Sequence, residues 1–576
     1  MEARNLGDLL RRSCKQYGDK AAMLVHREGS FRPVSYSRLW DEAVRAASAL
    51  KDLDLKRGDR LCIQSENCIE WAFADWGAQV LGIIVVPIYP TLPADQTQHI
   101  IRDSGAKVIL SGEGQEAKAE GVDGLKVVAL KDLFKGGAGW LVPAADSEAA
   151  KTNQPAPSLD VGREIDATQP EDVATIIYTS GTTGVPKGAM LQHRAFTSLM
   201  ESITSSLPIV ESDTFLSFLP MSHVYERVAG QILPISCGAT IAYARSIATL
   251  ANDMVAARPT IMLCVPRFLE ATMDRIVEGV GKQSPMKQKL FKWALAQGTA
   301  RAKGGFAPFA GLLDKLVGAK IRERTGGRIK FFVSGGAALP PHVSYFYMAF
   351  RLKVLQGYGL TETTAASCVN HPDRNKPWTV GPPIPGVEVK IAADGEILIK
   401  GPTRMLGYYN MPEETAAAID QDGWFLTGDI GEMEDGYLKI TDRKKDLLVL
   451  ANGKNVAPQM IENKLKESSL ISEAVVLGDG MDYCCALIIP NFEALRKQVG
   501  STQDDAELVA SEQAKAAIKS EIDAMNKSLA DFERVKRHVL LGKALTIEAG
   551  ELTPTLKVKR KVIKEKYSAE IQSMKR

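Results

Sequence analysis

Strand-like and helix-like segments alternate along the first half of the chain, and this alternation constrains the fold more than any other feature. A parallel strand needs a long crossover before its neighbour, and a helix commonly provides it. The alternation therefore predicts βαβ units and an α/β protein whose mostly parallel sheets are doubly wound. The helix-like segments are 35–53, 69–81 and 97–104, and the strand-like segments are 60–64, 82–88 and 107–110.

Changes in composition and pattern divide the chain of 576 residues. Residues 112–166 are rich in Ala, Gly, Glu and Pro, which indicates a surface connector rather than a domain core. Short strands between Gly, Pro and Asp predict a small β-barrel-like, β-rich subdomain over 381–441. We expect an N-terminal domain over 1–441, a hinge at 442–445 and a small, mobile α+β domain over 446–576.

The composition excludes several classes of protein. A formal net charge of +2 gives no general attraction to nucleic acid. The eight cysteines show neither metal-ligand spacing nor a disulfide framework, which indicates reduced thiols and a cytoplasmic location. The N-terminal segment lacks the apolar core of a signal peptide. Asp75, Pro87 and Pro90 interrupt the longest apolar stretch, so we expect no membrane span.

The C-terminal tail departs from this balance. Residues 557–576 contain eight Lys or Arg against two Glu. Such a tail could contact phosphates, a nucleotide-bearing substrate or the anionic surface of a membrane. A solvated terminal helix explains the same composition.

The segment Tyr178–Met190 carries the strongest functional signal. It reads Tyr-Thr-Ser-Gly-Thr-Thr-Gly-Val-Pro-Lys-Gly-Ala-Met and follows a β-branched, apolar strand pattern. Its glycines allow close backbone approach, its hydroxyls can donate hydrogen bonds and Lys187 adds a positive charge, which together suit a phosphate. Pro186 before the lysine and Gly188 after it argue against a P-loop NTPase. A surface turn would have a similar composition.

Five further motifs follow this loop in a fixed order, and together they resemble the adenylate-forming superfamily. Within it, the chain is most similar to long-chain fatty-acyl-CoA synthetases, and the resemblance covers residues 6–563. The five motifs are Leu219–Arg227, Ser334–Pro340, Gln356–Thr363, Trp424–Asp429 and Asp442–Asp446.

The resemblance implies a ligase that uses ATP, Mg²⁺ and coenzyme A. A fatty acid would attack the α-phosphorus of ATP to give acyl-AMP and pyrophosphate, and the thiol of coenzyme A would then displace AMP. A carboxylate is already ionised at neutral pH, so positioning and charge stabilisation suffice for the first step. No nucleophilic triad is needed, and the sequence presents none.

The resemblance also assigns roles to individual residues. Tyr358 would lie against adenine, Thr361 would contact the α-phosphate, and Glu362 would bind magnesium with Thr179 as a second ligand. Asp429 and Arg443 would hold the ribose. The residues expected around ATP are Thr179, Ser180, Gly181, Thr182, Thr183, Gly184, Lys187, Gly336, Gln356, Gly357, Tyr358, Gly359, Thr361, Glu362, Asp429, Arg443 and Lys559.

Three residues are expected to act in catalysis. Lys187 would bind the β- and γ-phosphates, and His223 would stabilise negative charge beside the acyl carboxylate. Lys559 would bridge carboxylate and α-phosphate during adenylation, with Lys557 as a competitor because Val558 replaces the family's glycine. Lys445 stands where the family hinges.

Ordinary structural roles remain alternatives. Tyr358 could be core packing, Glu362 a helix-start carboxylate, Asp429 a turn residue and His223 a side chain that only orients its neighbours. Alternative functions are adenylation of another acid, transfer to a carrier protein, or a non-catalytic lipid-binding relative. The oligomeric state and the acyl chain length do not follow from the sequence.

Overall fold

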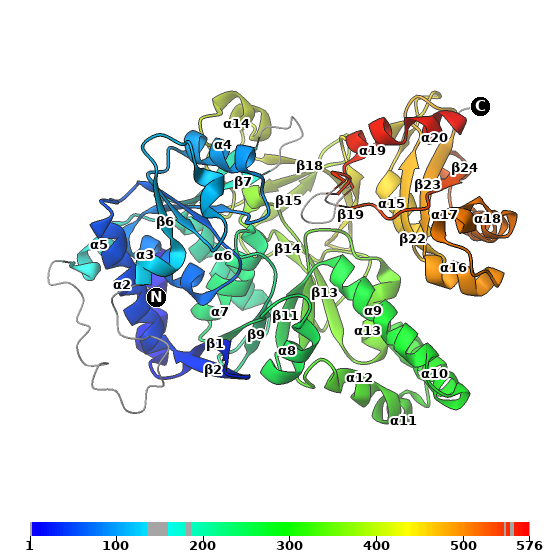
Figure 1. The fold of residues 1–576 in the computed structure, drawn as a ribbon, viewed down its shortest axis with the longest axis horizontal. Coiled ribbons are helices and arrows are strands. Elements are labelled where there is room, and N and C mark those ends of the chain that lie inside the picture. The colour runs from blue at the N-terminus through cyan, green and yellow to red at the C-terminus, as the bar shows by residue number, and fades with distance from the viewer. Residues whose placement is uncertain (1–2, 135–158, 180–185, 547–548, 553–557, 575–576) are drawn as a thin grey trace. The chain divides into compact units, whose positions relative to one another are not determined.

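The computed structural model describes residues 3–134, 159–179, 186–546, 549–552 and 558–574, coloured from blue to red in Figure 1. The chain forms two compact units. The first comprises residues 1–336, 345–389 and 398–426, and the second comprises 337–344, 390–397 and 427–576.

A seven-stranded sheet in the first unit confirms the predicted parallel core. The strands from β7 to β6 pair in parallel, whereas β8 and β17 join the other edge antiparallel. In spatial order the strands are β17 (Gly407–Tyr408), β8 (Lys187–Gln192), β7 (Val173–Thr179), β4 (Ile84–Ile88), β3 (Arg60–Gln64), β5 (Val108–Ser111) and β6 (Lys126–Ala129).

Strand β6 corrects the prediction that residues 112–166 form only a surface connector. It pairs in parallel with β5 at the edge of the sheet. Its four residues are exposed or half-buried, so they carry too little apolar pattern to be recognised as a strand.

An eight-stranded sheet forms the second layer system of this unit. Its pairings are parallel from β1 to β13, with an antiparallel strand at each edge. In spatial order the strands are β14 (Cys368–Val369), β13 (Lys353–Tyr358), β12 (Phe331–Ser334), β11 (Ile261–Cys264), β9 (Thr214–Ser217), β10 (Thr240–Tyr243), β1 (Ala21–Arg27) and β2 (Ser30–Ser35).

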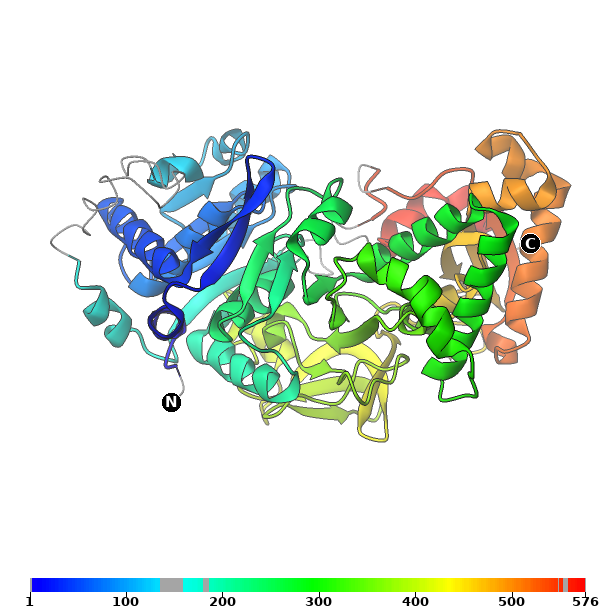
Figure 2. The ribbon, with the colours of Figure 1, turned by 90° about the horizontal axis from the view of Figure 1, so that it is seen from below.

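Helices connect and cover these strands (Figures 1 and 2). They are α1 (Leu6–Tyr17), α2 (Tyr36–Asp52), α3 (Ile69–Leu81), α4 (Ala94–Ser104), α5 (Val161–Ala167), α6 (His193–Ser206), the π-helix η4 (Glu226–Ile232), α7 (Leu233–Ser236), α8 (Leu250–Ala257), α9 (Pro266–Gly281), α10 (Pro285–Ala302), α11 (Ala310–Leu313), η5 (Asp314–Gly318), α12 (Ala319–Glu323), α13 (Pro341–Ala349), η6 (Thr361–Thr363) and α14 (Pro412–Ala418).

Helices α2 and α3 show how the sequence determines local packing. Ser35 caps α2 by accepting a hydrogen bond from the Arg38 amide. Gly77 lets α3 approach α2 closely, since a Cβ there would lie 2.6 Å from the Cβ of Ala46. A larger residue at Gly77 would push these helices apart.

A buried ion pair joins elements that are distant in the sequence. Arg227 is fully buried, and its Nε and Nη2 donate hydrogen bonds to the Asp75 carboxylate at 2.8 and 2.5 Å. Its Nη1 donates to Thr175 Oγ1 at 2.7 Å. Arg227 therefore connects η4 to α3 and to β7, the strand that enters the Gly-rich segment.

The β-rich texture of residues 381–441 is confirmed by a four-stranded sheet. The sequence predicted three of its strands and missed the longest, β18, because Gly428, Asp429 and Gly431 interrupt the apolar pattern. The strands are β15 (Glu388–Ile391), β16 (Glu396–Lys400), β18 (Phe425–Glu434) and β19 (Tyr437–Arg443).

A three-stranded sheet with a hydrophobic core on each face forms the centre of the second unit. Alternate residues of neighbouring strands, such as Val476 and Val475, enter opposite cores. One core packs against α15 and α18, and the other against α19 and α20. The elements are β20 (Leu448–Val449), β21 (Asn455–Val456), α15 (Pro458–Leu465), β22 (Ile471–Leu477), β23 (Cys484–Pro490), α16 (Phe492–Val499), α17 (Asp505–Ala510), α18 (Glu512–Asn526), β24 (Val535–Leu540), α19 (Arg560–Lys566) and α20 (Ser568–Ser573).

Removing the carboxylate of the buried pair tests this arrangement. We expect Asp75→Ala to lower the free energy of unfolding by about 3–5 kcal/mol, because it leaves the Arg227 guanidinium buried without its charge partner. Asp166→Ala is the control, since the Asp166 side chain is 53% exposed where it pairs with Arg4, and we expect a loss below about 1 kcal/mol. Urea unfolding followed by circular dichroism measures both; equal losses would contradict the role of the pair.

Candidate active site

The Gly-rich segment connects two antiparallel strands. Thr179, the last residue of β7, pairs with Lys187, the first residue of β8, and its hydroxyl donates a hydrogen bond to the Lys187 carbonyl at 3.5 Å. The predicted site residues Ser180, Gly181, Thr182, Thr183 and Gly184 lie outside the described residues. The sequence predicted the strand before the glycines but not β8 after them.

Tyr408 brings two of the predicted residues together. The Lys187 ammonium lies 5.2 Å from the centre of the Tyr408 ring, and the Tyr408 hydroxyl donates a hydrogen bond to Glu362 at 2.9 Å. Burial and the adjacent Glu362 carboxylate raise the pKa of Tyr408, which therefore stays protonated as a donor. Sequence reasoning missed Tyr408. Its only local signal is the tyrosine pair Tyr408-Tyr409 after Gly407.

A strained turn holds Glu362 in place. Glu362 is buried in η6, and Thr364 and Ala365 directly after it have φ angles of 54° and 78°. A β-branched residue rarely adopts a positive φ, and such strain is concentrated at functional sites. Gly359 before the turn cannot be replaced without rearrangement, because a Cβ there would lie 2.3 Å from the Ala365 carbonyl oxygen.

Strand β13 carries the residues expected near adenine. Gly357 and Tyr358 pair antiparallel with β14, and Tyr358 is half-buried. The Gln356 side chain donates a hydrogen bond to the Pro377 carbonyl at 2.6 Å, so that amide group serves the local fold. Gly336, which follows β12, has a φ of 82°. Thr361 opens η6 and is half-buried.

His223 lies in a turn whose geometry assigns its tautomer. The Tyr225 amide donates a hydrogen bond to His223 Nδ1 at 3.1 Å. Because Nδ1 is an acceptor, the neutral imidazole carries its proton on Nε2. The ring also lies 6.2 Å from that of Tyr89, and Asn67 bonds to the backbone of Leu219 and Met221 in the same turn.

Glu226, in the same motif, is a buried acid that the sequence did not indicate. Burial raises its pKa to about 7, despite hydrogen bonds from Ser217 and Gln231 that favour the charged form. Gly230 leaves room for it, since a Cβ there would lie 2.4 Å from its Oε1. The π-helix η4 begins at Glu226, and π-helical turns often occur at functional sites.

Asp429 and Arg443, both expected at the ribose, are direct neighbours across β18 and β19. Arg443 Nε lies 2.9 Å from Asp429 Oδ1, and Asp429 is buried. Lys445 follows after two residues, and burial together with the charge of Arg443 lowers its pKa. These residues belong to the second unit, whereas Lys187, His223 and Glu362 belong to the first.

Lys559 stands at the N-terminus of α19 with an exposed side chain. Its backbone amide donates a hydrogen bond to the Glu551 carbonyl at 2.8 Å, which fixes the main chain and leaves the ammonium in solvent. Lys557, its competitor, lies outside the described residues. The neighbouring Arg560 pairs with Glu462 at 2.7 Å and belongs to the core of the unit.

The donor set suits a metal that is shared with a substrate. Within the described ranges, no group of three or more His, Cys, Asp or Glu side chains could hold a metal ion. Magnesium commonly uses one or two carboxylates together with substrate phosphates and water. The buried carboxylate of Glu362, held by Tyr408, fits that requirement.

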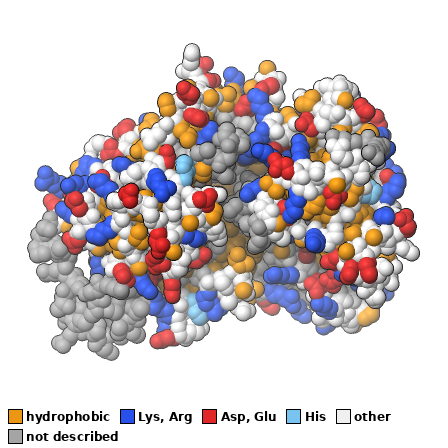
Figure 3. Space-filling model, turned by 45° about the horizontal axis from the view of Figure 1, so that its top comes forward, with side chains coloured by type: hydrophobic (Ala, Val, Ile, Leu, Met, Phe, Trp, Pro, Cys, Tyr) orange, Lys and Arg blue, Asp and Glu red, His pale blue; other side chains and the backbone are white. Residues whose placement is uncertain are grey.

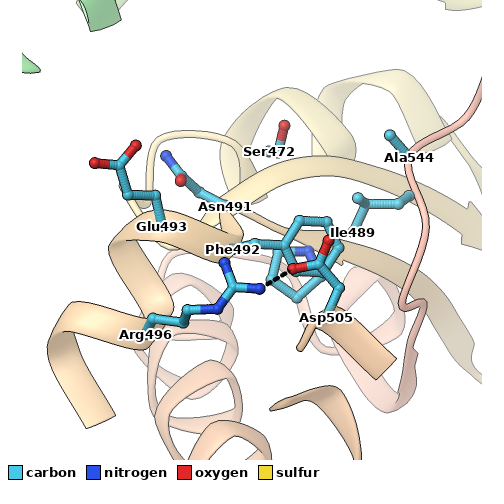
Figure 4. Close-up of a pocket in the computed structure, with 9 residues that line it drawn as sticks. Ser472, Ile489, Asn491, Phe492, Glu493, Arg496, Asp505 and Ala544 are labelled. Carbon is cyan, nitrogen blue, oxygen red and sulfur yellow. Dashed lines mark hydrogen bonds and ion pairs between the residues drawn. The ribbon is translucent and has the colours of Figure 1, made fainter. Parts of the chain in front are cut away.

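A surface cavity of about 450 Å³ lies in the second unit, away from every predicted site residue (Figure 4). Arg496 there pairs with Asp505, and Asn491 caps α16. Its polar groups therefore serve local structure, and we do not place the active site there. The lining residues are Ser472, Ile489, Pro490, Asn491, Phe492, Glu493, Arg496, Asp505 and Ala544.

The surface agrees with the balanced composition. Figure 3 shows basic and acidic side chains mixed over the visible face. Among the helices that the structure describes, none is both long and apolar enough to cross a membrane. Three basic side chains of the tail are paired with carboxylates: Arg560 with Glu462, Lys564 with Asp479 and Lys566 with Glu551.

Comparisons with known proteins place this geometry in a family. The family model described as "AMP-binding enzyme" matches residues 10–409, and the model "AMP-binding enzyme C-terminal domain" matches residues 445–576. A long-chain-fatty-acid–CoA ligase, FadD15, from Mycobacterium bovis is 33% identical, covering 95% of this chain and 93% of the relative. Fatty acyl-CoA synthetase A from Dictyostelium discoideum is 31% identical, covering 95% and 86% respectively.

A solved structure has the same fold. The fatty acyl CoA synthetase of Mycobacterium tuberculosis matches with a TM-score of 0.65 and 23% identity, over 98% of this chain and 99% of that one. The fold and both family models agree with the resemblance carried by the five sequence motifs. The chain belongs to the family of AMP-binding enzymes, in which acyl-CoA synthetases are its similar relatives.

Proposed function

We propose that this protein is an AMP-forming acyl-CoA synthetase that joins a long-chain fatty acid to coenzyme A with ATP. The contact of Tyr408 with both Lys187 and Glu362 carries the proposal, because it sets a cation and a hard oxygen donor beside the Gly-rich segment. The relatives named long-chain fatty-acid–CoA ligases support the choice of acid. The free cysteines agree with the reducing cytoplasm.

In the first step a carboxylate oxygen of the fatty acid attacks the α-phosphorus of ATP. The bond from that phosphorus to the bridging oxygen breaks, and pyrophosphate leaves with the electron pair. Lys187 and the Gly-rich segment stabilise the negative charge on the departing phosphates. Magnesium on Glu362 would neutralise phosphate charge. His223 donates from Nε2 toward the oxygen that carries developing charge.

The remaining predicted residues position the nucleotide. Tyr358 offers its ring to adenine, and Asp429 accepts hydrogen bonds from the ribose hydroxyls beside Arg443. In the second step the thiol sulfur of coenzyme A attacks the acyl carbon, the bond to AMP breaks and the thiol proton is released. We propose that the C-terminal domain after the hinge at 442–445 moves about Lys445 between the two steps.

A panel of acids tests the reaction and its specificity. We expect formation of acyl-CoA and AMP from saturated fatty acids with Mg²⁺ and ATP, with kcat/KM rising toward long chains because each buried methylene contributes about 0.8 kcal/mol. Product formation is measured by mass spectrometry. Aromatic and amino acids in ATP–pyrophosphate exchange are the controls. AMP formation with these acids alone, or with none, would contradict the proposal.

Lys559 is tested by separating the half-reactions. We expect Lys559→Ala to slow acyl-AMP formation by roughly 10²–10³-fold, the effect of losing one donor to a charged transition state, and to leave thioester formation from supplied acyl-AMP nearly unchanged. Lys561→Ala removes an exposed lysine from the same helix and serves as the control. Equal loss in both half-reactions would refute this role, and a loss confined to Lys557→Ala would transfer it to that residue.

Tyr408 is tested as a positioning residue. We expect Tyr408→Phe to raise the KM for MgATP roughly five-fold, since the hydrogen bond that orients Glu362 contributes about 1 kcal/mol, with a smaller change in kcat. Tyr409→Phe, the adjacent substitution, should leave both constants unchanged. Steady-state kinetics at varied Mg²⁺ give the comparison, and identical kinetics for Tyr408→Phe and wild type would exclude the role.

A further inference from the structure

One helical segment of the first unit exposes a concentration of large apolar side chains. It runs through α10, α11 and η5, which Figure 1 labels in part and Figure 2 turns toward the reader in green. We call the exposed side chains the α10–α11 surface. They are Met286 (78% exposed), Trp293 (44%), Phe306 (89%), Phe309 (49%), Leu312 (57%) and Leu316 (48%).

Helix α10 is apolar on two faces, and the fold covers only one of them. Phe291 is buried and stacks on Phe350 at 5.6 Å between ring centres. Gly298 lets the same face approach Ala349, where a Cβ would lie 2.3 Å from the carbonyl oxygen. Met286 and Trp293, two turns apart, lie on the other face. A surface helix usually has one apolar face, so the second indicates a binding surface.

Contacts within the surface hold its aromatic side chains together. The rings of Trp293 and Phe309 are 5.3 Å apart, and the Phe309 amide donates a hydrogen bond to Gln297 Oε1. Phe309, Leu312 and Leu316 follow at helical spacing and are all exposed. The apolar groups of α10 and of the segment after it therefore form one surface that exists before any partner binds.

The charges around this surface are almost all positive. Residues 282–324 contain ten Lys or Arg and two acidic residues. One of the acids, Asp314, is paired with Arg322 at 2.6 Å. Among the described residues, no carboxylate lies within ion-pairing distance of four exposed lysines, which are Lys289, Lys292, Lys315 and Lys320.

We propose that the α10–α11 surface docks the protein on an anionic lipid bilayer. Trp and Phe favour the headgroup boundary, and lysines beside them reach the lipid phosphates. A second copy would bring two positive surfaces together, which electrostatics opposes. The basic tail is less suited, because Arg560, Lys564 and Lys566 already pair with carboxylates. The inference goes beyond the proposed function, and vesicle binding needs no turnover.

Flotation of the full chain with lipid vesicles tests the apolar part. Wild type should bind vesicles of phosphatidylcholine with phosphatidylglycerol much more tightly than phosphatidylcholine alone. We expect Trp293→Ser with Phe306→Ser to weaken binding by at least ~10-fold, since large apolar contacts with the interface are lost. Val210→Ser with Ile247→Ser is the matched control, because both side chains are exposed elsewhere in the same unit.

A second pair of variants tests the charges. Lys289→Gln with Lys292→Gln should weaken binding to the anionic vesicles by roughly 10-fold or more, at about 1 kcal/mol for each lysine near the surface, and high salt should have a similar effect. Lys561→Gln with Lys564→Gln removes the same charge from the tail and should have little effect. Thermal unfolding checks that each variant is folded.

Three outcomes would overturn the proposal. They are absence of wild-type binding to anionic vesicles, equal weakening by the matched controls, and loss of binding only in the tail variant. Analytical ultracentrifugation adds a fourth, because a dimer that the Trp293→Ser, Phe306→Ser variant dissociates would assign the surface to a second copy. Quenching of tryptophan fluorescence by brominated lipid, reduced in Trp293→Phe, would support direct contact.

Discussion

The hydrogen-bonded charges of Arg227, Asp75 and Thr175 are the interaction on which the first unit depends. Asp75 lies on α3, Thr175 on the strand that leads into the Gly-rich segment, and Arg227 at the end of the motif that contains His223. A fully buried guanidinium is stable only when its donors are satisfied, so these three elements must assemble together. The interior of the unit thereby holds the phosphate side and the acyl side of the proposed site in one arrangement.

The proposed chemistry draws on both compact units. Lys187, Tyr408 and Glu362 form a connected group in the first unit, and Asp429 with Arg443 forms another in the second. Each group is complete within its own unit, because its contacts come from neighbouring strands or turns. Such a division suits a reaction in which one nucleotide must be held while two different acceptors reach the same acyl group.

Local patterns predicted much of the fold. The segments 60–64 and 69–81 match β3 and α3, because buried strands and helices carry continuous apolar signals. Strand β6 was missed, since an exposed edge needs no such signal. For the site, motif order brought out Asp429 and Arg443, which the structure shows as cross-strand neighbours. Tyr408 and Glu226 escaped because their importance arises from contacts with residues distant in sequence or from burial, neither of which a local pattern records.

The pairing of β17 with β8 has a consequence for how this region can vary. Tyr408 lies opposite Ala189, and successive side chains of a strand point to opposite faces. A shift of the pairing by one residue would turn Tyr408 away from Glu362 and present Tyr409 in its place, with its hydroxyl in a different position. Insertions or deletions of one residue beside Gly407 should therefore be rare among functional homologues, whereas length changes in exposed connections should be common.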